Sequence, residues 1–214
     1  MKKVFVVGGS GRVATTLIKD LISANIEVIA GARHPEKVIQ DPHVTAVKLD
    51  LHHSTTEIAN QMLGADAVYF VAGSRGHDLL QTDAMGAVKT MQAAKQANIK
   101  RYIMLSSMYA LQPEKWHEYP ALAEITDYNI AKFFADHYLI NDTDLDYTIV
   151  QPATLTEKPA TGKVTFGEGD DTTNTIDDVA MVLAKVLTAK NTIHKVIMMR
   201  NGDTPIDQAI NNIK

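Results

Sequence analysis

Tyr128 and Lys132 stand four residues apart in the stretch "YNIAK", inside a run whose apolar spacing predicts a helix. This spacing places both side chains on one helix face. A lysine close to a tyrosine hydroxyl favours the phenolate and lowers a pKa that is ordinarily about 10. Tyr128 could then donate or accept a proton while hydride moves to or from a nicotinamide ring, and Lys132 could bond the nicotinamide ribose. The competing interpretation is that Tyr128 only packs on the helix while Lys132 anchors a cofactor.

The stretch "GGSGRVA", from Gly8 to Ala14, follows an apolar run and opens a helical pattern. Glycine at position 8 permits a tight turn, glycine at 11 lets the backbone approach a diphosphate, and alanine at 14 lets the helix pack on the strand. Backbone N–H groups and the helix N-terminus would then face the phosphates. An ordinary glycine-rich turn is the alternative. The expected phosphate contacts are Gly8, Ser10, Gly11, Arg12 and Val13.

The end of the second expected strand bears on the choice of dinucleotide. A carboxylate there would bind a ribose 2′-hydroxyl and favour NAD, but this strand ends in Arg33. Arg12 emerges from the glycine turn nearby, so two guanidinium groups could clamp the 2′-phosphate of NADP. A hydrogen bond to a charged group contributes about 1.5 kcal/mol at the low end, or about tenfold in affinity. We therefore expect NADP(H) to be preferred over NAD(H). A solvated surface charge at Arg33 is the alternative.

Residues that follow the third and fourth expected strands complete the candidate cofactor site. Asp50 is placed to contact the adenine edge, as an acidic residue often does in doubly wound folds, with Leu51 against the ring. Ala72 and Gly73 would back the ribose side, where glycine lets the backbone approach the nicotinamide half of the cofactor. The two histidines after Leu51 point apart. No third ligand lies at a useful spacing, so no metal site is expected.

Short β-branched runs alternate with longer amphipathic stretches along the chain. The runs are nearly continuously apolar, as strands buried on both faces are. The expected strands are 3–7, 27–32, 44–49, 67–72, 101–106, 146–151 and 195–199. The expected helices are 12–24, 55–63, 79–98, 122–140, 176–187 and 205–213. The polar stretch 157–175 is expected to be a loop near the carboxyl ends of the late strands.

Strand–helix alternation implies a parallel sheet with helices on both faces. The right-handed crossover rule then favours a doubly wound arrangement. The expected fold class is α/β, a single doubly wound Rossmann-type parallel sheet of about seven strands. The 214 residues, 45% of them hydrophobic, suit one domain that spans 1–214. The substrate region is expected in 74–82, 108–128 and 152–175.

Composition excludes several function classes. The net charge of −4 gives no basic excess for nucleic acid. No apolar run reaches the roughly 18 residues of a membrane span. The apolar start breaks at Gly8, too early for a signal peptide. The chain has no cysteine, which excludes disulfides, thiolate catalysis and cysteine–zinc sites. A reducing cytoplasm is the expected location.

The stretches "VFVVGGSGRVA", "ARHPEKV", "QAAKQANIKRYIMLSS", "YNIAK" and "DLDYTIVQPATLT" occur in an order that resembles the atypical short-chain dehydrogenase/reductases. The likeness is greatest to the NmrA-like proteins and the flavin-reductase type of biliverdin reductase, and it covers nearly the whole chain. It implies a dinucleotide-binding Rossmann fold. Ser106 and Ser107 end the fifth strand, and the analogy favours Ser107 as the hydroxyl that polarises a carbonyl. It also places Pro152, Ala153 and Thr154 along the nicotinamide.

Two departures from the family pattern lie near the expected substrate mouth. The family usually reads Arg-Pro-Gly where this chain has Gln151 and Ala153 around the proline. It usually carries an arginine where this chain has Asp177, before the aspartate of "TIDDVA". Both departures remove positive charge. They argue against recognising an anionic substrate by analogy with the family.

Together these residues predict an NADP(H)-binding oxidoreductase that transfers hydride to or from a small carbonyl, alcohol or conjugated acceptor. Ser107, Tyr128 and Lys132 are its expected catalytic residues. An NmrA-like redox sensor that reports to a partner protein is one alternative, because little chain remains after Pro152 for a substrate domain. A nucleotide-sugar epimerase shares the motifs but requires a larger sugar-binding lobe. A homodimer is common in this fold, although nothing in the sequence specifies an interface.

Overall fold

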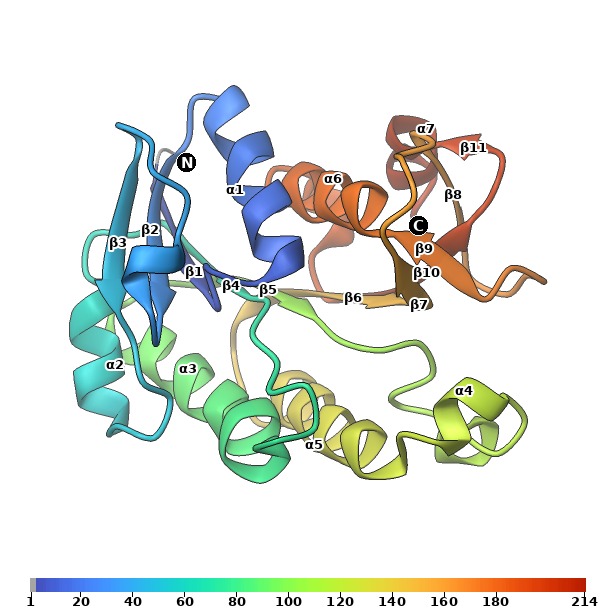
Figure 1. Ribbon diagram of the computed structural model, residues 1–214, viewed down its shortest axis with the longest axis horizontal. Helices are drawn as coiled ribbons and strands as arrows, with labels where there is room; N and C mark the ends of the chain where they lie inside the picture. The colour runs from blue at the N-terminus through green and yellow to red at the C-terminus, as the bar shows by residue number, and fades with distance from the viewer. Residues whose placement is uncertain (1–2) are drawn as a thin grey trace.

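The computed structural model describes residues 3–214, and a nine-stranded sheet forms its middle layer. The strand order is β11-β8-β10-β6-β5-β4-β1-β2-β3, and helices cover both faces of the sheet (Figure 1). The seven strands from β3 to β10 are parallel, whereas β8 and β11 extend the sheet antiparallel. The parallel strands are β1 (Lys3–Val7), β2 (Glu27–Ala32), β3 (Val44–Lys48), β4 (Ala67–Phe70), β5 (Arg101–Leu105), β6 (Asp146–Pro152) and β10 (Lys195–Asn201).

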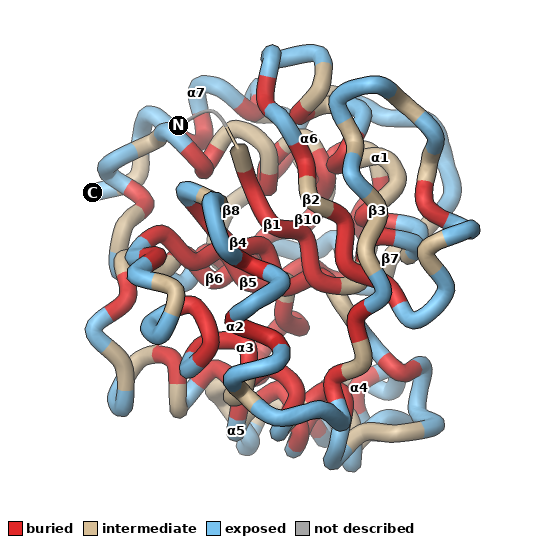
Figure 2. The backbone as a smooth tube through the Cα atoms, turned by 90° about the vertical axis from the view of Figure 1, so that its left-hand side faces the viewer, coloured by how far each residue is buried: buried red, intermediate tan, exposed pale blue. Residues whose placement is uncertain are grey.

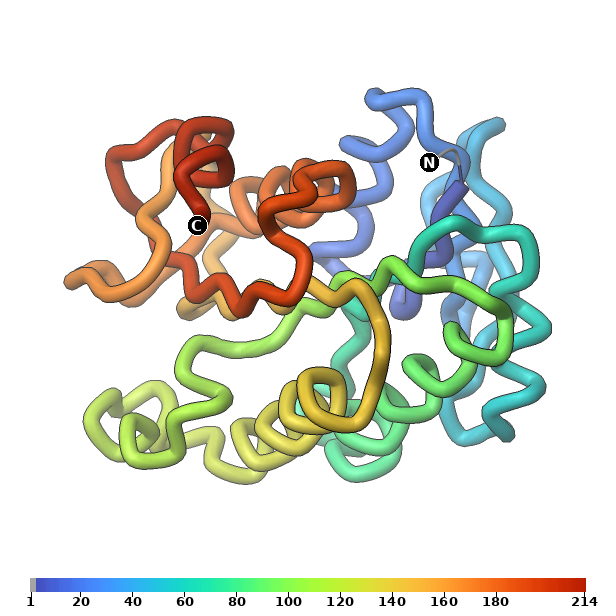
Figure 3. Tube along the Cα trace, turned by 180° about the vertical axis from the view of Figure 1, so that it is seen from behind, coloured from blue at the N-terminus to red at the C-terminus, as the bar shows by residue number. Residues whose placement is uncertain are grey.

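The helices divide between the two faces of the sheet, as Figures 1 and 3 show from opposite sides. One face carries α1 (Arg12–Ser23), α6 (Ile176–Val186) and α7 (Ile206–Asn211). The other carries α2 (Thr55–Met62), α3 (Met85–Gln96), α4 (Pro120–Ala123) and α5 (Thr126–Asn141). Each face buries its own large apolar cluster, so the strands between them are buried on both sides (Figure 2). This is why the parallel strands read as continuous apolar runs.

The doubly wound α/β fold expected from the sequence is confirmed, with more strands than expected. The polar stretch 157–175 was wrongly expected to be only a loop. It contains β8 (Lys163–Phe166), which pairs with β10, and β9 (Thr173–Thr175), which pairs with the short β7 (Thr154–Thr156). Strand β8 lies between β10 and the two-residue edge strand β11 (Thr204–Pro205), which pairs only with Lys163 and Val164. In β8 only Val164 is fully buried, which leaves no continuous apolar run.

Two expected helices are broken where the structure positions side chains for the site. The segment 79–98 opens with a wide π-helical turn, Leu79–Ala84, before α3 begins. Single π-helical turns are frequent at functional sites. The segment 122–140 divides into α4 and α5. Within residues 3–214, none of the helices has the length and apolar character needed to cross a membrane.

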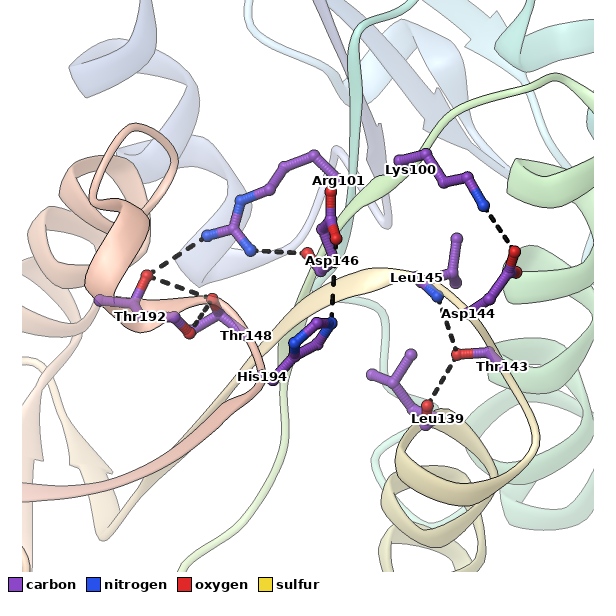
Figure 4. Close-up of polar contacts among 10 residues, drawn as sticks. All are labelled: Lys100, Arg101, Leu139, Thr143, Asp144, Leu145, Asp146, Thr148, Thr192 and His194. Atoms are coloured by element: carbon purple, nitrogen blue, oxygen red, sulfur yellow. Dashed lines mark hydrogen bonds and ion pairs between the residues drawn. The ribbon is translucent and has the colours of Figure 1, made fainter. Parts of the chain in front are cut away.

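Polar side chains at the amino-terminal edge of the sheet fasten β5, β6 and the end of α6 together (Figure 4). Arg101, at the start of β5, is buried and donates to the carbonyl oxygens of Asp146 at 2.7 Å and Val186 at 2.6 Å. Thr148 Oγ1 donates to the Thr192 carbonyl at 2.7 Å. A cation at the last carbonyls of a helix satisfies acceptors that the helix leaves free.

Candidate functional site

The opposite, carboxyl-terminal edge of the sheet carries three adjoining hollows. A groove of about 640 Å³ crosses the ends of β1, β2 and β4, where the strand order reverses. Ligands of open α/β sheets bind at such a switch point. A side pocket lies toward β3, and a cavity of about 640 Å³ lies beyond β5 and β6. Arg33 and Ala72 line both groove and side pocket, while Arg12 and Tyr128 line both groove and cavity.

The structure brings every candidate residue to one of these hollows. The groove is lined by Gly8, Ser10, Gly11, Arg12, Val13, Arg33, Ala72, Gly73 and Lys132. The side pocket adds Asp50 and Leu51. The cavity adds Ser107, Pro152, Ala153 and Thr154. Residues far apart in the sequence therefore line one continuous depression.

The glycine turn between β1 and α1 has the geometry of a phosphate-binding turn. Gly8 has a φ of +88°, and a Cβ at this position would lie 2.6 Å from Ala72 Cα, so only glycine fits without rearrangement. Gly11 begins α1 and provides no side-chain cap, and the first turn of α1 has no acidic residue. The free N–H groups and the positive end of the helix dipole are thus available to an anion at the groove.

The two arginines expected to bind a 2′-phosphate differ in their contacts. Arg33 is exposed at the end of β2. The Nη1 atom of Arg12 instead pairs with Glu157 Oε1 at 3.0 Å, between side chains that are 53% and 72% exposed. An ion pair this exposed contributes little and is screened by salt. Arg12 is therefore free to exchange Glu157 for a stronger anion in the groove.

Lys132, on α5, is buried at the inner end of the groove. Its side chain is 2% exposed, and its Nζ lies 5.5 Å from the ring centroids of both Phe70 and Tyr128. The Nζ atom donates to the Leu105 carbonyl at 3.4 Å and lies 4.0 Å from Asp83 Oδ1. An ammonium has three N–H donors, so this cage leaves donor capacity for a ligand in the groove.

Asp83, on the π-helical turn, is a functional candidate that the sequence analysis missed. It is fully buried beneath the groove, and its Oδ2 accepts a hydrogen bond from the Ser74 backbone N at 3.0 Å. Its Oδ1 finds no hydrogen-bond partner among residues 3–214. A side chain at Gly73 would bring a Cβ to 3.4 Å from that oxygen. The buried Asp83 carboxylate thus faces Lys132, and its Oδ1 has no hydrogen-bond donor in the described part of the chain. An unpaired buried acceptor costs stability, so this atom calls for a functional explanation.

A second buried carboxylate, Asp136, lies two helical turns beyond Tyr128 on α5. Its Oδ2 accepts hydrogen bonds from Ser106 Oγ at 2.7 Å and Gln151 Nε2 at 2.8 Å. Burial raises the pKa of Asp136 to about 7, although these two donors and the charge of Lys132 act to lower the pKa. Charge on this carboxylate therefore changes near neutral pH.

The hydrogen bond to Asp136 distinguishes the two serines at the end of β5. Ser106 Oγ is bonded to Asp136 below the cavity floor. Ser107 also lines the cavity, and its Oγ is the hydroxyl that remains for a ligand.

The environment of Tyr128 differs from the sequence expectation. Burial raises the pKa of the Tyr128 hydroxyl above its ordinary value, and this effect outweighs the lowering by Lys132. The nearby carboxylates of Asp83 and Asp136 raise the pKa further. Lys132 lowers the pKa of Tyr128, as the sequence predicts, but burial and the two carboxylates outweigh this lowering. The spacing of Tyr128 and Lys132 alone does not reveal how deeply the folded chain buries the hydroxyl.

A family model described as NAD(P)H-binding matches residues 8–190. The chain belongs to this NAD(P)H-binding family. The uncharacterized sugar epimerase YhfK of Bacillus subtilis is 32% identical over 219 residues, which cover 99% of this chain and 100% of that protein. The oxidoreductase ylbE of Lactococcus lactis, a crystal structure, is 44% identical and superposes with a TM-score of 0.95 over 99% of this chain and 96% of that one.

The wider fold family includes dinucleotide complexes. A short-chain dehydrogenase/reductase from Veillonella parvula, solved in complex with NADP, superposes with a TM-score of 0.77 over 97% of this chain and 98% of that one. Only 16% of the residues are identical, so this likeness concerns the fold. Membership of an NAD(P)-binding Rossmann family with oxidoreductase-like and epimerase-like relatives confirms the resemblance to atypical short-chain dehydrogenase/reductases.

Proposed function

We propose that the chain is an NADP(H)-dependent oxidoreductase that transfers hydride to or from a small carbonyl, alcohol or conjugated acceptor. The observation that carries this proposal is the position of Tyr128 where groove and cavity meet, with Lys132 beside it in the groove. A dinucleotide in the groove and a substrate in the cavity would meet at these two side chains. The family's NAD(P)-binding character supports the assignment of the groove.

The residues present fit a dinucleotide along the whole groove. The turn at Gly8 and the uncapped start of α1 suit the diphosphate. Asp50 and Leu51 in the side pocket suit adenine. Arg33, exposed where groove and side pocket join, suits the 2′-phosphate that distinguishes NADP from NAD. Arg12 would supply a second guanidinium after leaving Glu157.

The chemistry in the reducing direction would divide among three side chains. A bound NADPH would supply the hydride that adds to the carbonyl carbon. The Tyr128 hydroxyl would give its proton to the carbonyl oxygen as the C=O electron pair moves onto that oxygen. Ser107 Oγ would donate a hydrogen bond to the same oxygen. Lys132 would bond the ribose, and its charge would stabilise the phenolate that remains on Tyr128.

The raised pKa of Tyr128 also favours a second candidate, a redox sensor that binds NADP(H) and reports to a partner protein without turnover. A tyrosine that holds its proton firmly donates it poorly, which disfavours the proton transfer that reduction requires. In such a protein, Lys132 would anchor the cofactor and Tyr128 would only pack against the groove. The two candidates share the cofactor and differ in what the Tyr128 hydroxyl does.

The Tyr128→Phe variant separates the two candidates. Purified protein would be assayed for NADPH oxidation with a panel of small aldehydes and ketones, and its NADPH affinity would be measured by fluorescence. The enzyme predicts a fall in kcat/KM of at least about a hundredfold, with NADPH affinity within threefold of the parent. Tyr138→Phe is the matched control, because Tyr138 lies on the same helix and its hydroxyl bonds Gln92, away from the cavity. Turnover independent of the Tyr128 hydroxyl, or none despite NADPH binding, would contradict the enzyme.

A further inference from the structure

The cavity beside Tyr128 has mainly apolar walls. Met108, Leu122, Ile125 and Leu155 line it, together with backbone and small side chains from β6 and α4. Its volume of about 640 Å³ lies within the range of about 300–1,000 Å³ that holds small organic ligands. Arg12 and Tyr128 line both the cavity and the groove, and Ser107 lines the cavity. The cavity thus combines an apolar body with a polar end where the groove begins.

The charged residues that line the cavity do not create a site for an anion. They are Arg12 and Glu124. Arg12 is paired with Glu157 and also lines the groove. The phosphates of a cofactor bound there would bind its guanidinium. Glu124 is exposed near the start of α5 and brings a negative charge to the rim. Ser106 lines the cavity but donates to Asp136, so its hydroxyl is engaged by the protein and is not offered to an anion.

The buried cations Arg200 and Lys132 do not line the cavity. Arg200 lies behind Met108 and donates to the carbonyl oxygens of Gly167 and Asp171, each at 3.1 Å, and to that of Gly169. Lys132 faces the groove and Asp83. Neither cation is available to a carboxylate or phosphate in the cavity. A substrate anion would lose its hydration there without gaining a partner charge.

We propose that the cavity takes an uncharged carbonyl compound with an aromatic or branched aliphatic body. Its oxygen would lie at Ser107 and Tyr128, and its body would lie against Leu122, Ile125 and Leu155. This inference rests on the proposed function for the placement of the carbonyl group. In the reaction, hydride from bound NADPH forms the new C–H bond and Tyr128 protonates the oxygen. The carbonyl is thereby reduced to an alcohol, while NADPH is oxidised to NADP⁺.

The inference also separates this cavity from that of an enzyme acting on nucleotide sugars. Such substrates carry a diphosphate, which is recognised by arginine, lysine or helix N-termini. The cavity presents Arg12 only at the border with the groove, and Glu124 adds a negative charge at the rim. A nucleotide sugar would have to place its diphosphate against apolar walls.

A matched pair of ketones tests the inference by binding as well as by turnover. The probes are methyl 4-acetylbenzoate and 4-acetylbenzoate, which share the ketone and the ring and differ by one negative charge. Their affinities would be measured by calorimetry with and without NADP⁺, a state in which neither ketone can be reduced. We expect the ester to bind at least tenfold more tightly. Equal affinity, preference for the acid, or absence of ester binding would overturn the inference.

The same pair keeps this inference distinct from the proposed function. Reduction of the ester would be followed with NADPH. If the ester binds selectively but is not reduced by NADPH, the proposed reaction fails and the neutral character of the cavity stands. If the acid is reduced more efficiently than the ester, the oxidoreductase stands and the neutral cavity fails.

A lysine introduced at the rim of the cavity should shift the relative affinity of the two ketones toward the acid. Ile125 is 41% exposed, so Ile125→Lys adds a cation to the cavity with little risk to folding. The ratio of ester to acid affinity is expected to fall at least threefold. Leu63→Lys is the control, because Leu63 is 62% exposed at the end of α2 and does not line the cavity. An unchanged ratio in Ile125→Lys, or the same fall in Leu63→Lys, would contradict the proposed position of the ligand.

Discussion

Arg101 and Lys132 are both buried cations, yet they lie at opposite edges of the sheet and are held in different ways. Arg101, at the amino-terminal edge, donates to the carbonyls of Asp146, Val186 and Leu187 and to the hydroxyl of Thr192. Figure 4 shows its bonds to Asp146 and Thr192. Lys132, at the carboxyl-terminal edge, donates to one carbonyl and faces Asp83 at 4.0 Å. The first cation is saturated by its own protein, whereas the second retains capacity for a ligand.

Buried side-chain atoms without a hydrogen-bond partner are also unevenly distributed between the two edges of the sheet. In residues 3–214, the buried side-chain atoms without a hydrogen-bond partner belong to Ser74, Asp83, Asn129, Asp136, Asn174 and Asn201. All six residues lie in segments at the carboxyl-terminal edge, and none contacts Arg101. A polar group that is buried and unpaired costs stability, so such groups collect where a ligand completes them. Among the six, Ser74 lines the groove and Asp83 lies beside Gly73 and Lys132, so these two hold the unpaired atoms nearest the candidate site.

The largest expected effect comes from breaking the structural edge. Arg101→Leu would leave several carbonyl oxygens, including those ending α6, without a donor. The free energy of unfolding is expected to fall by about 3–5 kcal/mol in urea titrations, while NADPH affinity of the folded fraction stays unchanged. Lys100→Leu is the control, because Lys100 is 61% exposed and pairs with the exposed Asp144. A loss below about 1 kcal/mol in Arg101→Leu would contradict a structural role, since exposed ion pairs contribute that much at most.

The next effect concerns Asp136 and pH. Because burial raises its pKa from 3.8 to about 7, the folded state binds more protons than the unfolded state between these values. Stability should therefore fall as pH rises through this window, by up to about 4 kcal/mol from this group. Asp136→Asn should remove this decline when unfolding is measured at several pH values. An identical pH dependence of parent and variant would contradict the buried, proton-binding carboxylate.

The exposed Asp144 should show the opposite pH dependence of stability. The hydrogen bond from Lys100 holds the pKa of this exposed carboxyl below its ordinary value. Its contribution to stability is therefore present above the unfolded-state pKa and is lost as pH falls through the folded-state pKa. Asp144→Asn should therefore lower stability above the unfolded-state pKa, and the stability curves of parent and variant should converge below the folded-state pKa.

A double variant sharpens the comparison at Lys132. Lys132→Met removes the cation that faces Asp83 and should weaken NADPH binding about tenfold to a hundredfold, or about 1.5–3 kcal/mol. It should also lower stability, because Asp83 becomes an unpaired buried carboxylate. Adding Asp83→Asn should restore stability without restoring NADPH affinity. Recovery of both properties in the double variant would mean that Lys132 acts only through the fold.

The smallest expected effect concerns Arg12. Glu157→Gln would release this arginine from an exposed ion pair worth about 0.2–1 kcal/mol. NADPH should then bind up to about threefold more tightly at low salt, with the gain disappearing at high salt. Weaker NADPH binding in this variant would indicate that Glu157 helps to hold the cofactor and does not compete for Arg12.

The parallel sheet could be predicted from the sequence because strands buried on both faces must be continuously apolar. Strand β8 could not, because it lies next to the edge of the sheet and only its Val164 is fully buried, so it has no continuous apolar run. The turn at Gly8 was predictable because few residues other than glycine adopt its backbone geometry. Asp83 was not, because its burial depends on contacts with Ser74 and Lys132 that only the folded chain creates. The spacing of Asp136 from Lys132, four residues along one helix face, was a signal available in the sequence.

The central claim is that the groove holds NADP(H), and a titration with NADPH and NADH at matched ionic strength tests it most directly. The account predicts that NADPH binds at least about tenfold more tightly, in line with one charged hydrogen bond to the 2′-phosphate. Arg33→Ala should remove most of this preference. Lys37→Ala should not, because Lys37 lies on the adjacent turn and outside the groove. Equal affinities for the two dinucleotides, or no binding of either, would contradict the account.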